Sequence, residues 1–283
     1  MSSPPKADAG IPFLYRETLK FLHDVAHDPN AGTDEQELWP KLGRYTYSAF
    51  AQQTFGLEIK TDTSPSIPYI HETGLAQIIA TFPGPYIVDM LQILDKLPPF
   101  MKTWEISARA RFQRDLNWCR EKMKKVKKLI SNGNEPDALL SKALKDEKLL
   151  GFSCEDEAAY MSLMLIIGAA DTSQISTWSF LEAMLYYPDV QEKARQQVDE
   201  VSLQSANLPD PTKRDHFAFG AGRRICPGLH IAERSLALAI MRILWAFDIK
   251  PKPSAAGRAF DPADYRGGMP GTAGTGLPGT LDG

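Results

Sequence analysis

Hydrophobic side chains recur every three to four residues along most of the chain, which is the pattern of helices that bury one face. The longest segments of this kind predict helices over 15–27, 34–55, 103–130, 153–187, 189–201 and 230–247. Residues 78–97 are also apolar, but Pro83, Gly84 and Pro85 interrupt them, and residues 61–74 are expected to contain a loop. No segment alternates steadily between polar and apolar positions, so the expected fold is mainly α.

Local signals fix several helix ends. Ser131-Asn132-Gly133-Asn134 predicts the end of the helix over 103–130, and Pro188 predicts the end of the helix that begins near Ser153. At that start, Ser153 and Asp156 resemble a capping box with an acidic third residue.

Composition and charge narrow the class of protein. The net charge of −3 over 283 residues argues against a nucleic-acid partner. The three cysteines are far apart and odd in number, so they predict neither a zinc site nor a disulfide framework, and a reducing compartment is expected. Residues 1–10 lack the apolar core of a signal peptide, and the longest apolar stretch, 158–170, is too short to span a membrane.

Residues 219–228, FGAGRRICPG, place a single cysteine in a glycine-rich loop ahead of the last helix. The glycines allow sharp turns and a close approach to a flat ligand, and a helix N-terminus favours the thiolate form of Cys226. Arg224 offers a permanent charge and a fork of donors that suits a carboxylate. The pattern favours a metal-binding thiolate over the alternative, a buried structural cysteine.

A second unusual pattern lies within the long apolar helix. Asp171 and Thr172 follow three small residues, 168–170, and two polar side chains in so apolar a helix are costly unless they are satisfied. The alternative interpretation is a core helix whose Asp and Thr are bonded internally. A third feature, the lysines of 122–128, would suit an acidic partner or a membrane surface, although a solvated helix face is the favoured interpretation.

The two motifs together resemble those of the cytochromes P450. Residues 219–228 match the haem-binding loop F-G-x-G-x-R-x-C-x-G, and residues 168–173 match the oxygen-helix motif [AG]-[GA]-x-[DE]-T-[TS]. The resemblance implies haem b with Cys226 as the axial iron ligand, and Thr172 and Asp171 as the oxygen-binding and proton-relay residues. By the same resemblance, the haem-binding positions are Phe219, Gly220, Gly222, Arg224, Gly228, Gly168 and Ala169.

The chain departs from the family pattern in two places. The Glu-x-x-Arg helix of the family has no counterpart between Thr172 and Cys226, and Glu192–Arg195 reads as a surface pair on an earlier helix. The first third of the family, including its membrane anchor, also lacks a counterpart. We therefore expect a partial P450 fold without most of the β-sheet, as one helical domain over 14–250 between a flexible segment, 1–13, and a Pro/Gly-rich segment, 251–283.

The resemblance implies a haem-thiolate monooxygenase that inserts one atom of O2 into an apolar organic substrate, with electrons from NADPH through a separate cytochrome P450 reductase. Segments 82–98 and 213–218 resemble fungal members, which suggests secondary metabolism. The alternative is a non-catalytic remnant, truncated or mis-spliced, that binds haem poorly or not at all. Full-length relatives would lie at the endoplasmic reticulum membrane, whereas a chain without an anchor is compatible with the cytoplasm.

Overall fold

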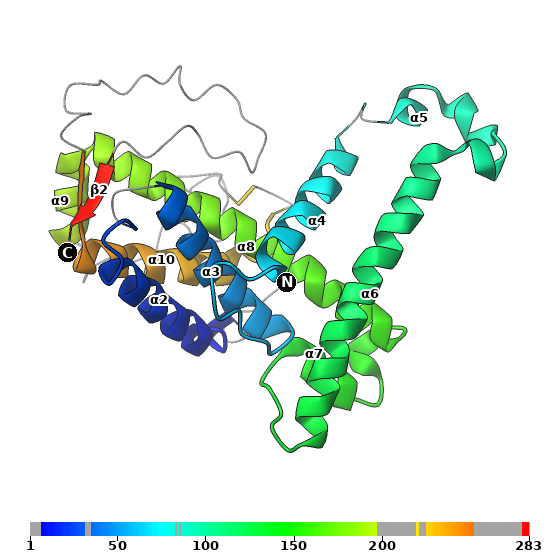
Figure 1. Ribbon diagram of the computed structural model, residues 1–283, viewed down its shortest axis with the longest axis horizontal. Helices are drawn as coiled ribbons and strands as arrows, with labels where there is room; N and C mark the ends of the chain where they lie inside the picture. The colour runs from blue at the N-terminus through cyan, green and yellow to red at the C-terminus, as the bar shows by residue number, and fades with distance from the viewer. Residues whose placement is uncertain are drawn as a thin grey trace. The chain divides into compact units, whose positions relative to one another are not determined.

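The structure is a computed structural model that describes residues 7–31, 35–82, 84, 86–196, 219–220, 225–251 and 279–282. Most of these residues are helical (Figure 1), which confirms the expected class. The described strands form one small antiparallel pair, β1 (Asp248–Pro251) with β2 (Gly279–Asp282), in which Ile249 lies opposite Leu281. The extensive sheet of a complete P450 fold is not seen in these ranges.

The chain divides into two compact units. Residues 1–46 and 172–283 form the first, and residues 47–171 form the second. Two helices, α3 (Glu35–Thr54) and α8 (Glu155–Tyr186), contribute residues to both units. The single helical domain expected over 14–250 stays a prediction.

The first unit contains α2 (Ile11–Ala26), α9 (Pro188–Gln196) and α10 (Leu229–Ala246), with parts of α3 and α8. Arg242 joins α10 to α2, because its guanidinium donates to Thr18 Oγ1 at 2.5 Å and lies 3.7 Å from the centre of the Tyr15 ring. The side-chain amide of Gln191 on α9 bonds both the N–H and the carbonyl of Ile249. Polar contacts therefore fix the direction in which these helices pack.

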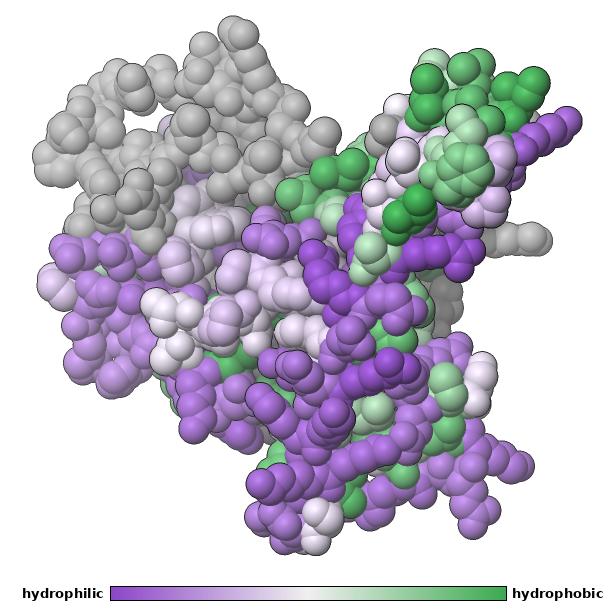
Figure 2. Space-filling model, turned by 45° about the vertical axis from the view of Figure 1, so that its right-hand side comes forward, coloured by the Kyte–Doolittle hydropathy of each residue, from purple (hydrophilic) through white to green (hydrophobic). Residues whose placement is uncertain are grey.

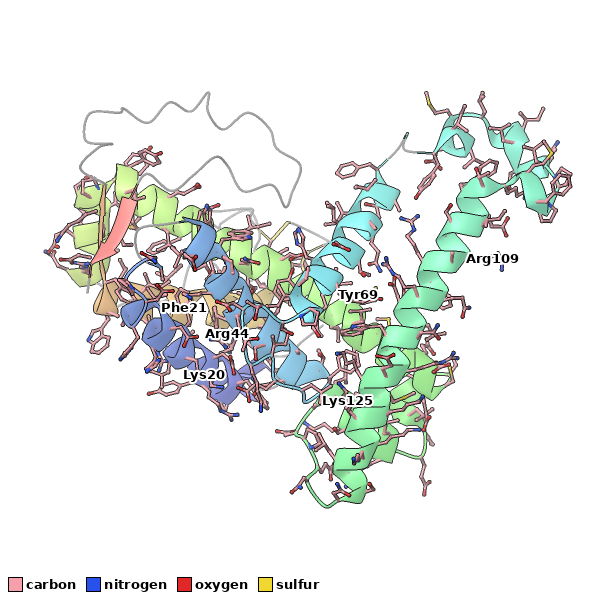
Figure 3. The ribbon with its side chains drawn as sticks, in the orientation of Figure 1. Lys20, Phe21, Arg44, Tyr69, Arg109 and Lys125 are labelled. Atoms are coloured by element: carbon pink, nitrogen blue, oxygen red, sulfur yellow. The ribbon has the colours of Figure 1, made fainter. Side chains whose placement is uncertain are left out.

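A buried ion pair holds α3 on α2 within the first unit. Arg44, labelled in Figure 3, has its Nη1 2.7 Å from Glu17 Oε2. Glu17 and Arg44 are 0% and 2% exposed. Asp24 Oδ2 lies 3.3 Å from Arg44 Nε and adds a second, more exposed carboxylate. Two charges out of water are tolerated only while each has its partner, so this pair restricts how α2 and α3 can be arranged.

The second unit contains α4 (Ser66–Thr81), α6 (Thr103–Ser131) and α7 (Leu139–Lys145), with the remaining parts of α3 and α8. Between α4 and α6 the chain forms only short helices, α5 (Ile87–Met90), η1 (Gln92–Lys96) and η2 (Pro99–Met101), and η3 (Leu149–Gly151) precedes α8. The predicted interruption of 78–97 is therefore confirmed. The loop expected within 61–74 ends at Pro65, and α4 begins at the next residue, Ser66.

Large apolar side chains are exposed on the short helices between α4 and α6. Met90, Ile93 and Phe100 are each more than 70% exposed, and Figure 2 shows the apolar surface that they help to form. Among the described helices, none is both long and apolar enough to cross a membrane.

The predicted ends of α6 and α8 hold, with one correction, and the end expected at residue 201 lies outside the described residues. α6 ends at Ser131 and α8 at Tyr186, before the glycine and proline signals. The capping partner was wrong, because Ser153 donates its N–H and hydroxyl to Glu157 at 2.6 Å each, whereas Asp156 pairs with Arg120 on α6. Asp156, which the sequence spacing assigned to the helix cap, is instead used in an ion pair with α6.

We expect Glu17→Ala to lower the free energy of unfolding by about 3 kcal/mol, because it leaves the Arg44 guanidinium in the interior without its main partner. Urea denaturation followed by circular dichroism measures the change. The matched control is Glu135→Ala, which removes a half-exposed pair with Lys145 and should cost less than about 1 kcal/mol. A loss for Glu17→Ala no larger than the control's would show that the buried pair does not hold α2 and α3 together.

Candidate functional site

The cysteine loop closes through its backbone. The N–H of Cys226 donates to the carbonyl of Phe219 at 2.8 Å, and Gly220 has φ +73°, a left-handed conformation that glycine adopts without strain. Two of the predicted haem-binding positions, Gly222 and Arg224, lie outside the described residues. The ends of the loop are thus brought together around the position of the thiol.

Cys226 lies half-buried three residues before α10 begins at Leu229. The Cys226 carbonyl accepts from the Leu229 N–H at 3.3 Å, and the Gly228 carbonyl accepts from the first turn of α10. A Cβ added at Gly228 would lie 3.8 Å from the Cys226 sulfur, so the backbone at Gly228 lies directly beside the thiol. Cys226 is therefore a reduced cysteine beside the N-terminus of α10.

One face of α8 lies open. Met161 and Leu165 are 40% and 47% exposed, and Gly168 and Thr172 follow them on the same face at helical spacing. A Cβ added at Gly168 would meet no described atom within 4 Å, and Ala169 beside it is half-buried. Gly168 therefore faces space that no described part of the chain fills, whereas Ala170 is fully buried.

Asp171 points elsewhere and is buried, at 9% exposure. The Tyr47 hydroxyl on α3 donates to its carboxylate, and His71 Nδ1 on α4 lies 3.1 Å from Oδ1 of the same group. The structure thus brings Asp171 together with Tyr47 and His71, two residues that sequence analysis missed. The sequence predicts that Asp171 needs a hydrogen-bond partner, because burying an unpaired carboxylate is costly, but it does not predict which residues are the partners.

Asp171 contributes to raising the pKa of both of its partners, Tyr47 and His71. Burial, followed by the charge of Asp171, raises the pKa of Tyr47, so its hydroxyl stays a donor. The hydrogen bond to Asp171 is the largest cause that raises the pKa of His71 above its ordinary value. The Asp171 carboxylate is therefore held between a fixed phenol and a partly exposed imidazole that retains its proton to higher pH.

Gly74 determines how closely α4 approaches α8. A Cβ at this position would lie 2.9 Å from Ile167 Cγ2 and 3.3 Å from Asp171 Oδ2, both on α8. His71 lies one turn earlier on the same face of α4, so this close contact brings the imidazole within reach of the carboxylate.

Comparison with known proteins identifies the family. A family model described as Cytochrome P450 matches residues 9–215 and 204–264, so the chain belongs to the cytochrome P450 family. A cytochrome P450 monooxygenase of Gibberella fujikuroi is 42% identical over 96% of this chain, and the cytochrome P450 monooxygenase virE of Hypocrea virens is 25% identical over 85%. A cytochrome P450 crystal structure (CYP102L1) has the same fold, with a TM-score of 0.60 and 12% identity over 89% of this chain and 70% of that one.

The chain is shorter than these relatives. It spans 66% of the Gibberella protein and 58% of virE. The first of these alignments covers 361 positions, more than the 283 residues of the chain, so the relative carries residues inside the aligned region that have no counterpart here. Such an internal gap is what the missing Glu-x-x-Arg helix predicts.

The expected surface pair between Glu192 and Arg195 is wrong. Glu192 accepts a hydrogen bond from Gln196, whereas Arg195 donates to the Phe247 carbonyl at 2.5 Å and pairs with Asp248. Arg195 thus joins α9 to the start of β1, which is a structural role within the first unit.

Membership of the family implies a haem cofactor. The residues present fit one, because the half-buried thiol of Cys226 lies beside a glycine at the N-terminus of α10. The described residues contain no group of three His, Cys, Asp or Glu side chains that would hold a metal ion by itself.

The contact between His71 and Asp171 predicts a pH-dependent stability. Because the folded-state pKa of His71 is raised, the pair stabilises fully below the ordinary histidine pKa of about 6.5 and is lost as pH rises through the folded-state value. We expect the difference in unfolding free energy between wild type and His71→Gln to be larger at pH 5.5 than at pH 9. Urea denaturation at the two pH values measures it.

Exposed His23, whose side chain is 68% exposed, supplies the control. His23→Gln should show a much smaller dependence on pH. Titration of the His71 ring by NMR gives an independent measurement, in which Asp171→Asn should lower the pKa of His71. An unchanged His71 titration in Asp171→Asn would rule out the coupling.

Proposed function

We propose that this chain is a haem-thiolate monooxygenase that inserts one oxygen atom of O2 into an apolar organic substrate, in fungal secondary metabolism. The observation that carries the proposal is the half-buried thiol of Cys226, which lies beside Gly228 at the start of α10. The backbone N–H of Cys226 closes the glycine loop by donating to the Phe219 carbonyl. Relatives named as monooxygenases from two fungi support it.

In this proposal the thiolate of Cys226 would hold the iron of haem b. Bound haem would supply the activation of dioxygen, helped by electron density from the thiolate. The backbone N–H of Cys226 is already used by Phe219, which fixes the loop and so the position of the sulfur. Gly220, Gly222, Gly228, Phe219 and Arg224 keep the roles that the motif implies, with Arg224 bonding a haem propionate.

Thr172 and Asp171 would handle protons. Thr172 is exposed on the same face of α8 as Gly168, and the motif assigns its side chain the contact with bound oxygen. Asp171, the next residue, is held by Tyr47 and His71 and so keeps a defined orientation. A carboxylate with fixed donors is suited to holding and passing a proton.

The proposal includes two partners. Electrons would come from NADPH through a separate cytochrome P450 reductase. An apolar substrate would be the natural neighbour of the exposed Met161 and Leu165 side chains on the open face of α8, because burying them removes apolar surface from water.

A second candidate is a remnant of the family that binds haem poorly or not at all. The alignment of 361 positions against 283 residues favours it, because a block inside the aligned region is missing. The open face of α8 is also consistent with a part of the fold that has lost its covering segments.

An absorption spectrum of the chain expressed with haem supply, reduced and exposed to carbon monoxide, separates the two candidates. We expect a red-shifted Soret band that Cys226→Ala abolishes, because the thiolate is then absent. The matched control is Cys154→Ala, at an exposed cysteine, which should keep the band. No bound haem in the wild type, or a band that survives Cys226→Ala, would favour the remnant.

A further inference from the structure

A cavity of about 510 Å³ lies within the second unit, apart from the cysteine loop and Thr172. The end of α3, the loop over 57–65, the start of α4 and one face of α6 line it. Its volume is in the range of sites that hold small organic molecules. The sequence motifs assign nothing to it.

One side of the cavity is apolar and rigid. Phe55 and Ile70 are each 1% exposed, and Ile166 is fully buried behind them. Trp118 completes this side, with its ring edge-on to Phe55 at 5.8 Å between centroids and stacked on Tyr69 at 5.2 Å. Fixed rings of this kind offer a flat surface that suits an aromatic or short aliphatic body.

The other side is cationic. Lys122 and Lys125 follow Trp118 on one face of α6, where Figure 3 labels Lys125. Lys122 Nζ lies 4.7 Å from the centre of the Trp118 ring and donates to Ser66 Oγ at 3.3 Å. Burial, and then the charge of Lys125, lowers the pKa of Lys122, so an anion placed here would relieve an unfavourable charge.

These two lysines differ from other cations of α6. Arg120 pairs with Asp156 and Lys127 with Glu155, both in the first turn of α8. Within the part of the chain that the structure describes, neither Lys122 nor Lys125 forms an ion pair. The lysine cluster seen in the sequence is therefore divided, and two of its charges face the cavity.

The rim of the cavity adds hydroxyl groups. A turn in which the Ser64 N–H donates to the Thr61 carbonyl at 3.2 Å places several of them near the lysines, and the contributors are Thr61, Thr63, Ser64 and Ser66. Lys60 and Glu58 also line the cavity, with charges of opposite sign that offset each other. The excess charge of the lining is therefore positive.

We propose that this cavity binds a small amphipathic organic anion, whose anionic group meets Lys122 and Lys125 while its apolar body lies against Trp118. The apolar walls favour a compact body over a polymer, and the unpaired lysines favour an anion over its neutral analogue. The proposal does not depend on haem binding.

Naphthalene-2-carboxylate and its neutral amide are a matched pair of probes. In the full chain with labelled isoleucine methyl groups, the anion should shift the signals of Ile59, Ile70 and Ile166, all of which line the cavity, in a saturable way. We expect the anion to bind about tenfold more tightly than the amide, the effect of one charge-assisted contact. Equal affinities, or no saturable shift of these three methyl groups, would overturn the proposal.

The variant Lys122→Gln/Lys125→Gln should weaken binding of the anion about tenfold and leave binding of the amide unchanged. Lys124→Gln/Lys128→Gln is the matched control, because these lysines are exposed on α6 and do not line the cavity. The methyl spectrum of each free variant reports whether it is folded. Lys125→Gln alone, at an exposed position, should give a smaller selective loss and keeps the test valid if the double variant unfolds. The same loss in the control would refute a site at these lysines.

Discussion

The second unit depends on how the buried carboxylate of Asp171 is satisfied. Asp171 lies in the apolar part of α8, where an isolated charge would cost several kcal/mol. Tyr47 from α3 and His71 from α4 both bond it, so three helices converge on one group. A helix that shifted would leave the acid without a donor, and this makes the polar cluster more selective for one packing than the apolar contacts around it.

The neighbouring residue, Thr172, is exposed, in contrast to the buried Asp171. It lies on the face of α8 that no described segment covers, with Gly168 and the exposed Leu165. Adjacent residues of one helix thus face in two directions, Asp171 toward the protein and Thr172 toward open space.

Sequence predicted the elements better than the contacts between them. Periodicity and the signals at Gly133 and Pro188 located the ends of α6 and α8, because such signals act within a few residues. The partners of Asp171 and the pairing of Arg44 with Glu17 were not readable, since Tyr47 and His71 are ordinary residues of amphipathic helices until the fold brings them to the acid. Sequence spacing also gave the wrong cap for α8, because Asp156 pairs with Arg120, a charge far away in the sequence, and does not cap the helix. The roles of Cys226 and Thr172 rest on motif resemblance and stay predictions.

Gly74 sets the alignment of α4 along α8. The backbone of α4 at Gly74 comes so close to Ile167 and Asp171 that a larger side chain at this position would not fit between the two helices. Sliding α4 along α8 by one turn, about 5.4 Å, would move Gly74 away from Ile167 and take the His71 ring out of hydrogen-bonding reach of Asp171. Gly74, which has no side chain, therefore sets the position of α4 at which His71, one turn away, contacts Asp171.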